Sequence, residues 1–71
     1  MTRINKVKYL INKGEKITYH VNSTRRLIVD YVKLDGRELY FKSYSEDQAE
    51  AGKVIDLLYW DWVFLGGRNN G

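Results

Sequence analysis

The sequence predicts a small α+β domain with an N-terminal helix, a three-stranded antiparallel sheet, and a C-terminal helix or helix-to-strand segment. Three observations predict it. Apolar residues recur at helical spacing near both ends of the chain, alternating β-rich runs fill the middle, and the dipeptide Asp35-Gly36 separates two of those runs. The alternative is a small mostly-β barrel, because the aromatic run of residues 59–64 also suits a strand.

The length allows one domain, which we assign to residues 1–66, with residues 67–71 as a flexible C-terminal tail. A chain of this size buries only about 60% of the surface that its unfolded form exposes. The sequence has no Cys and no Pro, so no disulfide supplements the core. The fold therefore depends on packing alone or gains buried area by association.

The first element predicted is a helix over residues 2–14. Ile4, Val7 and Ile11 are spaced by 3 and 4, which places them on one face. Thr2 can cap the start, and Gly14 suits the left-handed position just after the last turn. A strand is the alternative for this segment.

The middle of the chain predicts three strands. Residues 16–21 alternate apolar and polar side chains, and residues 26–45 contain two β-rich runs around the Asp35-Gly36 turn. If the loop there has two residues, the residue numbers of each cross-strand pair add up to 71. This register pairs Leu34 with Arg37, Lys33 with Glu38, Val32 with Leu39 and Tyr31 with Tyr40, and continues outward to Leu27 with Tyr44.

Alternation along this hairpin predicts its two faces. We expect one face to lie on the core, and it carries Ile28, Val32, Leu34, Leu39 and Phe41. The opposite face carries Leu27, Val29, Tyr31, Tyr40 and Tyr44, interleaved with Lys33, Glu38 and Lys42.

The C-terminal segment predicts a helix that begins near Glu46. Ser45 and Gln48 form a capping-box pattern, and a helical stripe follows at Ala51, Ile55, Leu58, Trp62 and Leu65. A switch to strand beyond Leu58 is the alternative. Residues 54–65 are the only segment apolar enough to cover the sheet.

As a helix, residues 54–65 are apolar nearly all round, so some of their side chains face outward. Exposed apolar patches of this kind usually mark interaction sites. We therefore predict a protein interface at Trp60, Trp62, Val63 and Phe64. The first functional hypothesis is a small non-enzymatic interaction module, or modulator, that binds a larger protein partner, itself, or both.

The charge distribution suggests an alternative function. Residues 1–26 contain seven basic and one acidic side chain, although the net charge of the whole chain is only +3. Such an excess attracts polyanions, and tyrosines beside lysines on an open sheet can stack on unpaired bases. The alternative is low-specificity nucleic-acid binding through Lys6, Tyr9, Lys13, Arg25, Arg26, Tyr31, Lys33, Tyr40, Lys42 and Tyr44.

Other function classes have little support in the sequence. The only histidine is His20, no cysteine accompanies it, and the carboxylates are scattered, so we expect no catalytic site, metal site or cofactor. The apolar run of residues 54–65 is too short for a membrane span, which needs about 20 residues. We expect a cytoplasmic protein with no small-molecule substrate.

The order of the elements resembles that of double-stranded-RNA-binding domains. Ser45 and Ala49 stand where that family often places a serine and an alanine at the start of its second helix. That family also places lysines there to bind phosphates, whereas this chain has Glu46, Asp47 and Glu50. Because a shared fold does not carry function, we derive no activity from this resemblance.

Overall fold

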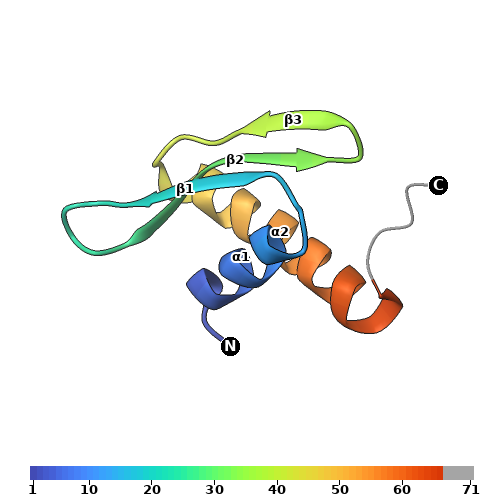
Figure 1. Cartoon of the computed structure of the whole chain (residues 1–71). Helices are drawn as coiled ribbons and strands as arrows, with labels where there is room; N and C mark the ends of the chain where they lie inside the picture. Colours follow the sequence, from blue (N-terminus) through green and yellow to red (C-terminus); the bar gives the residue numbers. More distant parts are fainter. Residues whose placement is uncertain (67–71) are drawn as a thin grey trace.

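A computed structural model describes residues 1–66 of the chain; the predicted tail, residues 67–71, lies outside the described residues. The elements are α1 (Arg3–Asn12), β1 (Ile17–Val21), β2 (Leu27–Leu34), β3 (Arg37–Tyr40) and α2 (Ser45–Leu65) (Figure 1). The strands form one open antiparallel sheet in the order β1-β2-β3. The predicted α+β class is confirmed, and the barrel alternative is wrong.

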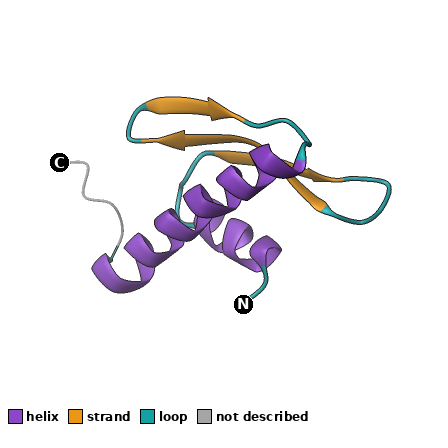
Figure 2. Ribbon diagram, turned by 180° about the vertical axis from the view of Figure 1, so that it is seen from behind, coloured by secondary structure: helices purple, strands orange, loops and turns teal. Residues whose placement is uncertain are grey.

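Both helices lie on one face of the sheet, and the other face is uncovered (Figures 1 and 2). The core forms between the sheet and the helices. Nearly all of its side chains are fully shielded from solvent: Val7, Leu10, Val29, Val32, Ala51, Ile55 and Leu58, with Ile17 almost so. Among residues 1–66, no helix has the length and apolar character that crossing a membrane requires.

Helix α1 forms as predicted, and the strand alternative is wrong. The Thr2 hydroxyl accepts a hydrogen bond from the Asn5 N–H at 3.3 Å, which caps the start of the helix. Val7 and Leu10 are buried, but Ile11 is 39% exposed. The buried stripe is therefore centred on Val7 and Leu10 rather than on the full predicted row.

The hairpin register is confirmed for its four inner pairs, from Leu34 with Arg37 out to Tyr31 with Tyr40. The turn residues Asp35 and Gly36 have φ angles of +53° and +80°, as a type I′ turn requires. Beyond them, the Phe41 N–H still donates a hydrogen bond to the Asp30 carbonyl at 3.0 Å, as the register predicts. The pairs farther out do not form, because β3 ends at Tyr40 and the chain turns away toward α2.

A β-bulge changes which residues of β2 face the core. Thr18 pairs with Tyr31 and Tyr19 pairs with Val29, so Asp30 is an extra residue on β2. The extra residue shifts the alternation by one position. Val29 and Val32 both lie in the core, with Leu27 packed beside them, so the prediction that Val29 and Leu27 face outward was wrong.

Helix α2 continues unbroken to Leu65, so the strand alternative beyond Leu58 is wrong. It ends at Gly66, whose φ of +73° is the left-handed conformation that favours glycine. The predicted capping box is also wrong. Tyr44 is the N-cap residue, no side chain caps the helix start, and the Gln48 side chain reaches the sheet instead.

Gln48 and Asp47 join α2 to the sheet where the hairpin pairing ends. The Gln48 amide accepts a hydrogen bond from the Val29 N–H at 2.9 Å and donates to the Val29 and Lys42 carbonyls at 3.0 and 2.7 Å. The Asp47 carboxylate accepts a hydrogen bond from the Lys42 N–H at 2.8 Å. These side chains satisfy backbone groups that a longer β3 would otherwise have paired.

Candidate interaction surface

The C-terminal end of α2 extends past α1 and away from the sheet (Figures 1 and 2). Helix α2 has 21 residues and α1 has 10. At a rise of about 1.5 Å per residue, α2 is therefore roughly twice as long as the helix beside it. The buried side chains of α2 end at Leu58. Several apolar side chains near this end of α2 are thus left uncovered by the core.

Five exposed apolar side chains lie on this part of α2, between Leu57 and Leu65, and we call them together the α2 patch. Leu57 and Trp60 are each 48% exposed, Val63 45%, Phe64 72% and Leu65 75%. The rings of Trp60 and Phe64 are stacked, with their centres 4.9 Å apart. Leu57, Trp60 and Phe64 are spaced by 3 and 4, so they form one stripe along the helix.

Three of the four predicted interface residues lie in this patch: Trp60, Val63 and Phe64. The fourth, Trp62, is partly buried against the core, and its indole N–H donates a hydrogen bond to the Glu15 carboxylate at 2.8 Å. Sequence reasoning missed Leu57, although it lies three residues before Trp60. The helical spacing also placed Leu65 on the buried stripe. Leu65 is exposed instead, because α2 extends beyond the core at this end.

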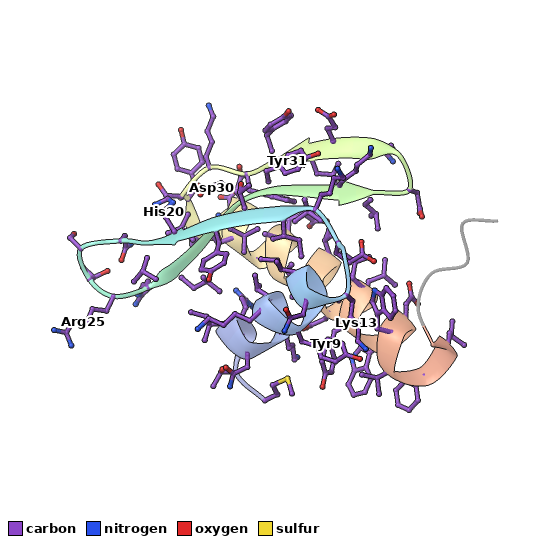
Figure 3. The ribbon with its side chains drawn as sticks, viewed as in Figure 1. Tyr9, Lys13, His20, Arg25, Asp30 and Tyr31 are labelled. Carbon is purple, nitrogen blue, oxygen red and sulfur yellow. The ribbon has the colours of Figure 1, made fainter. Side chains whose placement is uncertain are left out.

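The predicted basic face of α1 lies against α2. The Lys6 ammonium is 2.9 Å from the Asp56 carboxylate and 5.5 Å from the centre of the Tyr59 ring. Tyr9 packs edge-on against Tyr59, with ring centres 5.3 Å apart. The Lys13 ammonium lies over the Tyr9 ring at 5.4 Å, and Figure 3 shows these two side chains beside α2. These residues therefore hold the two helices together.

The interhelical role of this face explains why it does not form an open basic surface. The Lys6 side chain is only 19% exposed, and Lys13 also lies 5.7 Å from the Trp62 ring. Cation–π contacts and a partly shielded ion pair compete with any phosphate for these ammonium groups. The helical spacing predicted the side of α1 on which these residues lie, but not that α2 packs on it.

The predicted tyrosines and lysines of the sheet are divided between two places. Tyr31 and Tyr40 are neighbours on adjacent strands, with ring centres 5.2 Å apart, and Tyr40 is 71% exposed. Lys33 is exposed on the same strand as Tyr31. Lys42 and Tyr44 lie instead between β3 and α2, where the ammonium is 5.9 Å from the ring centre.

The side chain of Arg25 lies at the far end of the hairpin that joins β1 to β2 and points away from the domain (Figure 3). Its φ of +62° is unusual for a residue with a side chain. Arg26, its neighbour, lines a pocket near the start of α2. The ten predicted nucleic-acid residues therefore do not form one continuous surface.

His20 and Asp30 form a pair on the uncovered face of the sheet (Figure 3). The Nδ1 atom of His20 is 2.8 Å from the Asp30 carboxylate, and both side chains are substantially exposed. A carboxylate that orients an imidazole is one part of a catalytic arrangement. Within residues 1–66, however, no side chain hydrogen-bonds to the other ring nitrogen, and no cluster of three potential metal ligands is present.

Tyr40 offers a test of the geometry of the sheet surface. Its hydroxyl donates a hydrogen bond to the Glu38 carboxylate at 2.9 Å, and this bond, together with the negative charge of Glu38, raises the pKa of Tyr40 above its ordinary value of 10.0. We expect Glu38→Gln to lower the pH at which Tyr40 ionises. Ultraviolet absorbance titration measures this, and Tyr40→Phe identifies which transition belongs to Tyr40.

Because the pKa of Tyr40 is raised, the contribution of its hydrogen bond with Glu38 to the stability of the fold depends on pH. The bond stabilises the folded chain below the unfolded pKa of about 10, and this contribution is lost as the pH rises through the folded pKa. Glu46→Gln is the matched control, because Glu46 is an exposed glutamate on α2 outside this pair. An unchanged Tyr40 titration in Glu38→Gln would show that the two side chains do not interact in solution.

Comparisons of the chain with protein-family models, with curated proteins and with solved structures find no match.

Proposed function

We propose that this protein is a non-enzymatic interaction module that pairs with a second copy of itself through the α2 patch. The observation that carries the proposal is the exposure of five apolar side chains, by 45–75%, on the projecting end of one helix. Single exposed apolar residues are common on soluble proteins, but contiguous patches usually mark interaction sites.

The size of the patch supports this function. Aromatic side chains present 150–250 Å² each, so two that are half to three-quarters exposed, with three aliphatic neighbours, give a patch on the order of 500 Å². This is near the upper end of the largest patches on typical monomers, which are roughly 300–600 Å². With a polar rim, it approaches the roughly 800 Å² that each partner contributes to a standard interface.

A second copy is the occupant that the shape of the patch favours. The stripe of Leu57, Trp60 and Phe64 follows the axis of α2, and two helices can pack along such stripes by fitting ridges into grooves. A two-fold axis uses the same surface on both chains, so one patch suffices. Pairing also adds apolar burial to a fold whose own core is small.

The net charge of the chain predicts how salt affects the pairing. The chain carries a net charge of +3, so two copies repel each other. Salt screens this repulsion between exposed charges, and it leaves the apolar contact in place. Self-association through the α2 patch should therefore strengthen as the salt concentration rises.

The test is the double variant Trp60→Ser/Phe64→Ser. Buried aromatic side chains at the centre of an interface each contribute about 2 kcal/mol or more, so the dissociation constant should rise by more than about a hundredfold. Sedimentation velocity over a range of concentrations measures the change. Circular dichroism should be unchanged, because neither side chain belongs to the core.

The matched control is Tyr40→Ser/Tyr44→Ser, which removes two aromatic side chains that are 71% and 62% exposed but lie outside the patch. This variant should associate as the wild type does. A wild-type chain that stays monomeric at high protein and salt concentrations would refute self-pairing. Equal weakening in both double variants would refute the assignment to the α2 patch.

A further inference from the structure

A second feature, separate from the α2 patch, is an open pocket of about 720 Å³. It lies where the start of α1, the loop between β1 and β2, and the start of α2 meet. Arg3 enters it from α1 and Arg26 from the loop, and Ser43 and Ser45 line it beside the start of α2. Pockets that bind small ligands commonly have volumes of about 300–1,000 Å³.

The charge of the pocket is one-sided. Two arginines line it, and none of the residues that line it is an aspartate or a glutamate. Within residues 1–66, neither the Arg3 nor the Arg26 side chain forms an ion pair, and the hydroxyls of Ser43 and Ser45 have no hydrogen-bond partner. Four groups that can donate hydrogen bonds therefore remain available in the pocket.

The other polar side chains of the pocket form hydrogen bonds that fix its walls. Asn22 accepts hydrogen bonds from the backbone N–H groups of Thr24 and Arg26 at 3.1 and 2.9 Å, which shapes the loop. Gln48 is bound to β2 and to the segment after β3. The backbone that carries the available donors is thus held in place by other contacts.

The Arg3 side chain packs against Gly52. This glycine is buried in the middle of α2, a position where glycine costs about 1 kcal/mol relative to alanine. A Cβ atom at Gly52 would overlap the Arg3 guanidinium. Because that group is the end of a flexible side chain, alanine there would displace Arg3 without disrupting the helix.

We infer that this pocket binds a phosphate ester. Guanidinium groups match phosphate oxygens in a two-pronged geometry, and serine hydroxyls donate to the remaining oxygens. The volume exceeds that of a phosphate group, and Leu27 and Ile28 supply an apolar wall for an organic substituent. A small phosphorylated molecule and a phosphate of a nucleic-acid strand share this chemistry, so the test must separate them.

The experiment titrates the full chain with a nucleoside 5′-monophosphate at low ionic strength and follows amide chemical shifts. Binding should saturate, weaken with salt, and shift amides of the loop between β1 and β2 and of the start of α2. Arg26→Gln and Arg3→Gln should each weaken binding by about ten- to a hundredfold, because each removes charge-assisted hydrogen bonds. Gly52→Ala should also weaken it, although the net charge is unchanged.

The matched control is Arg25→Gln, which removes the same charge next to Arg26 but outside the pocket. It should bind as the wild type does, and so should Trp60→Ser/Phe64→Ser, because the α2 patch is a separate surface. An unphosphorylated nucleoside should not bind. An oligonucleotide that has only internal phosphates tests the other source. If it competes with the monophosphate, and if the pocket variants no longer bind it, the phosphate belongs to a nucleic-acid strand.

The inference fails if no phosphate probe saturates the protein at millimolar concentration. It also fails if Arg25→Gln weakens binding as much as Arg26→Gln, since the effect would then be diffuse electrostatic attraction. Equal binding of the nucleoside and its monophosphate would overturn the role of the phosphate. Binding by Gly52→Ala at the wild-type level would overturn the placement of Arg3 in the site.

Discussion

Leu58→Ala is expected to destabilise the fold by about 2–5 kcal/mol, the range for removing a fully buried leucine side chain. Leu58 is 0% exposed and belongs to the core between α2, α1 and the sheet. A domain of this length has a total stability of roughly 4–10 kcal/mol at 0.05–0.15 kcal/mol per residue. The substitution therefore removes a large part of the stability, and a urea titration followed by circular dichroism measures the loss.

The matched control is Leu57→Ala, one position earlier on the same helix. Leu57 is 48% exposed and belongs to the α2 patch, so its replacement should cost less than about 1 kcal/mol. Both titrations need a protein concentration at which the chain is monomeric, because pairing adds apparent stability. Equal shifts of the two midpoints would contradict the orientation of α2 on the sheet.

Gln48→Ala is expected to destabilise the fold by about 2–4 kcal/mol. The side chain forms three hydrogen bonds with the backbone of Val29 and Lys42, and the two bonds to Val29 are partly buried. A typical hydrogen bond contributes about 1 kcal/mol, and a shielded backbone group without a partner costs more. The variant should also detach the start of α2 from β2.

Hydrogen exchange provides the specific measurement for this contact. The Val29 amide should exchange much faster in Gln48→Ala, because its hydrogen bond to the side chain is lost. Gln48→Glu should also weaken this contact, since its carboxylate cannot donate to the two carbonyls and its charge is repelled by their oxygens. Glu50→Ala, on the same helix and exposed, is the control, and an unchanged Val29 exchange rate in Gln48→Ala would disprove the contact.

The two surfaces that carry the proposals differ in how far the sequence revealed them. The outward position of Trp60, Val63 and Phe64 followed from the helical spacing of residues 51–65, because a helix that is apolar nearly all round cannot bury every side. The pocket of Arg3 and Arg26 could not be found in this way. Its two arginines lie 23 positions apart, and only the packing of the helices against the sheet brings them together.

The order of the elements, the hairpin turn and the inner register of β2 and β3 follow from the sequence alone. These depend on short-range effects: a turn that requires positive φ at Asp35 and Gly36, side-chain alternation, and helical spacing. Three other features depend on how the elements pack: the bulge at Asp30, the contacts of Gln48 with the sheet, and the packing of Lys6, Tyr9 and Lys13 against α2. Each of these features involves contacts between residues that lie far apart in the chain. The spacing of residues along one segment contains no information about such contacts.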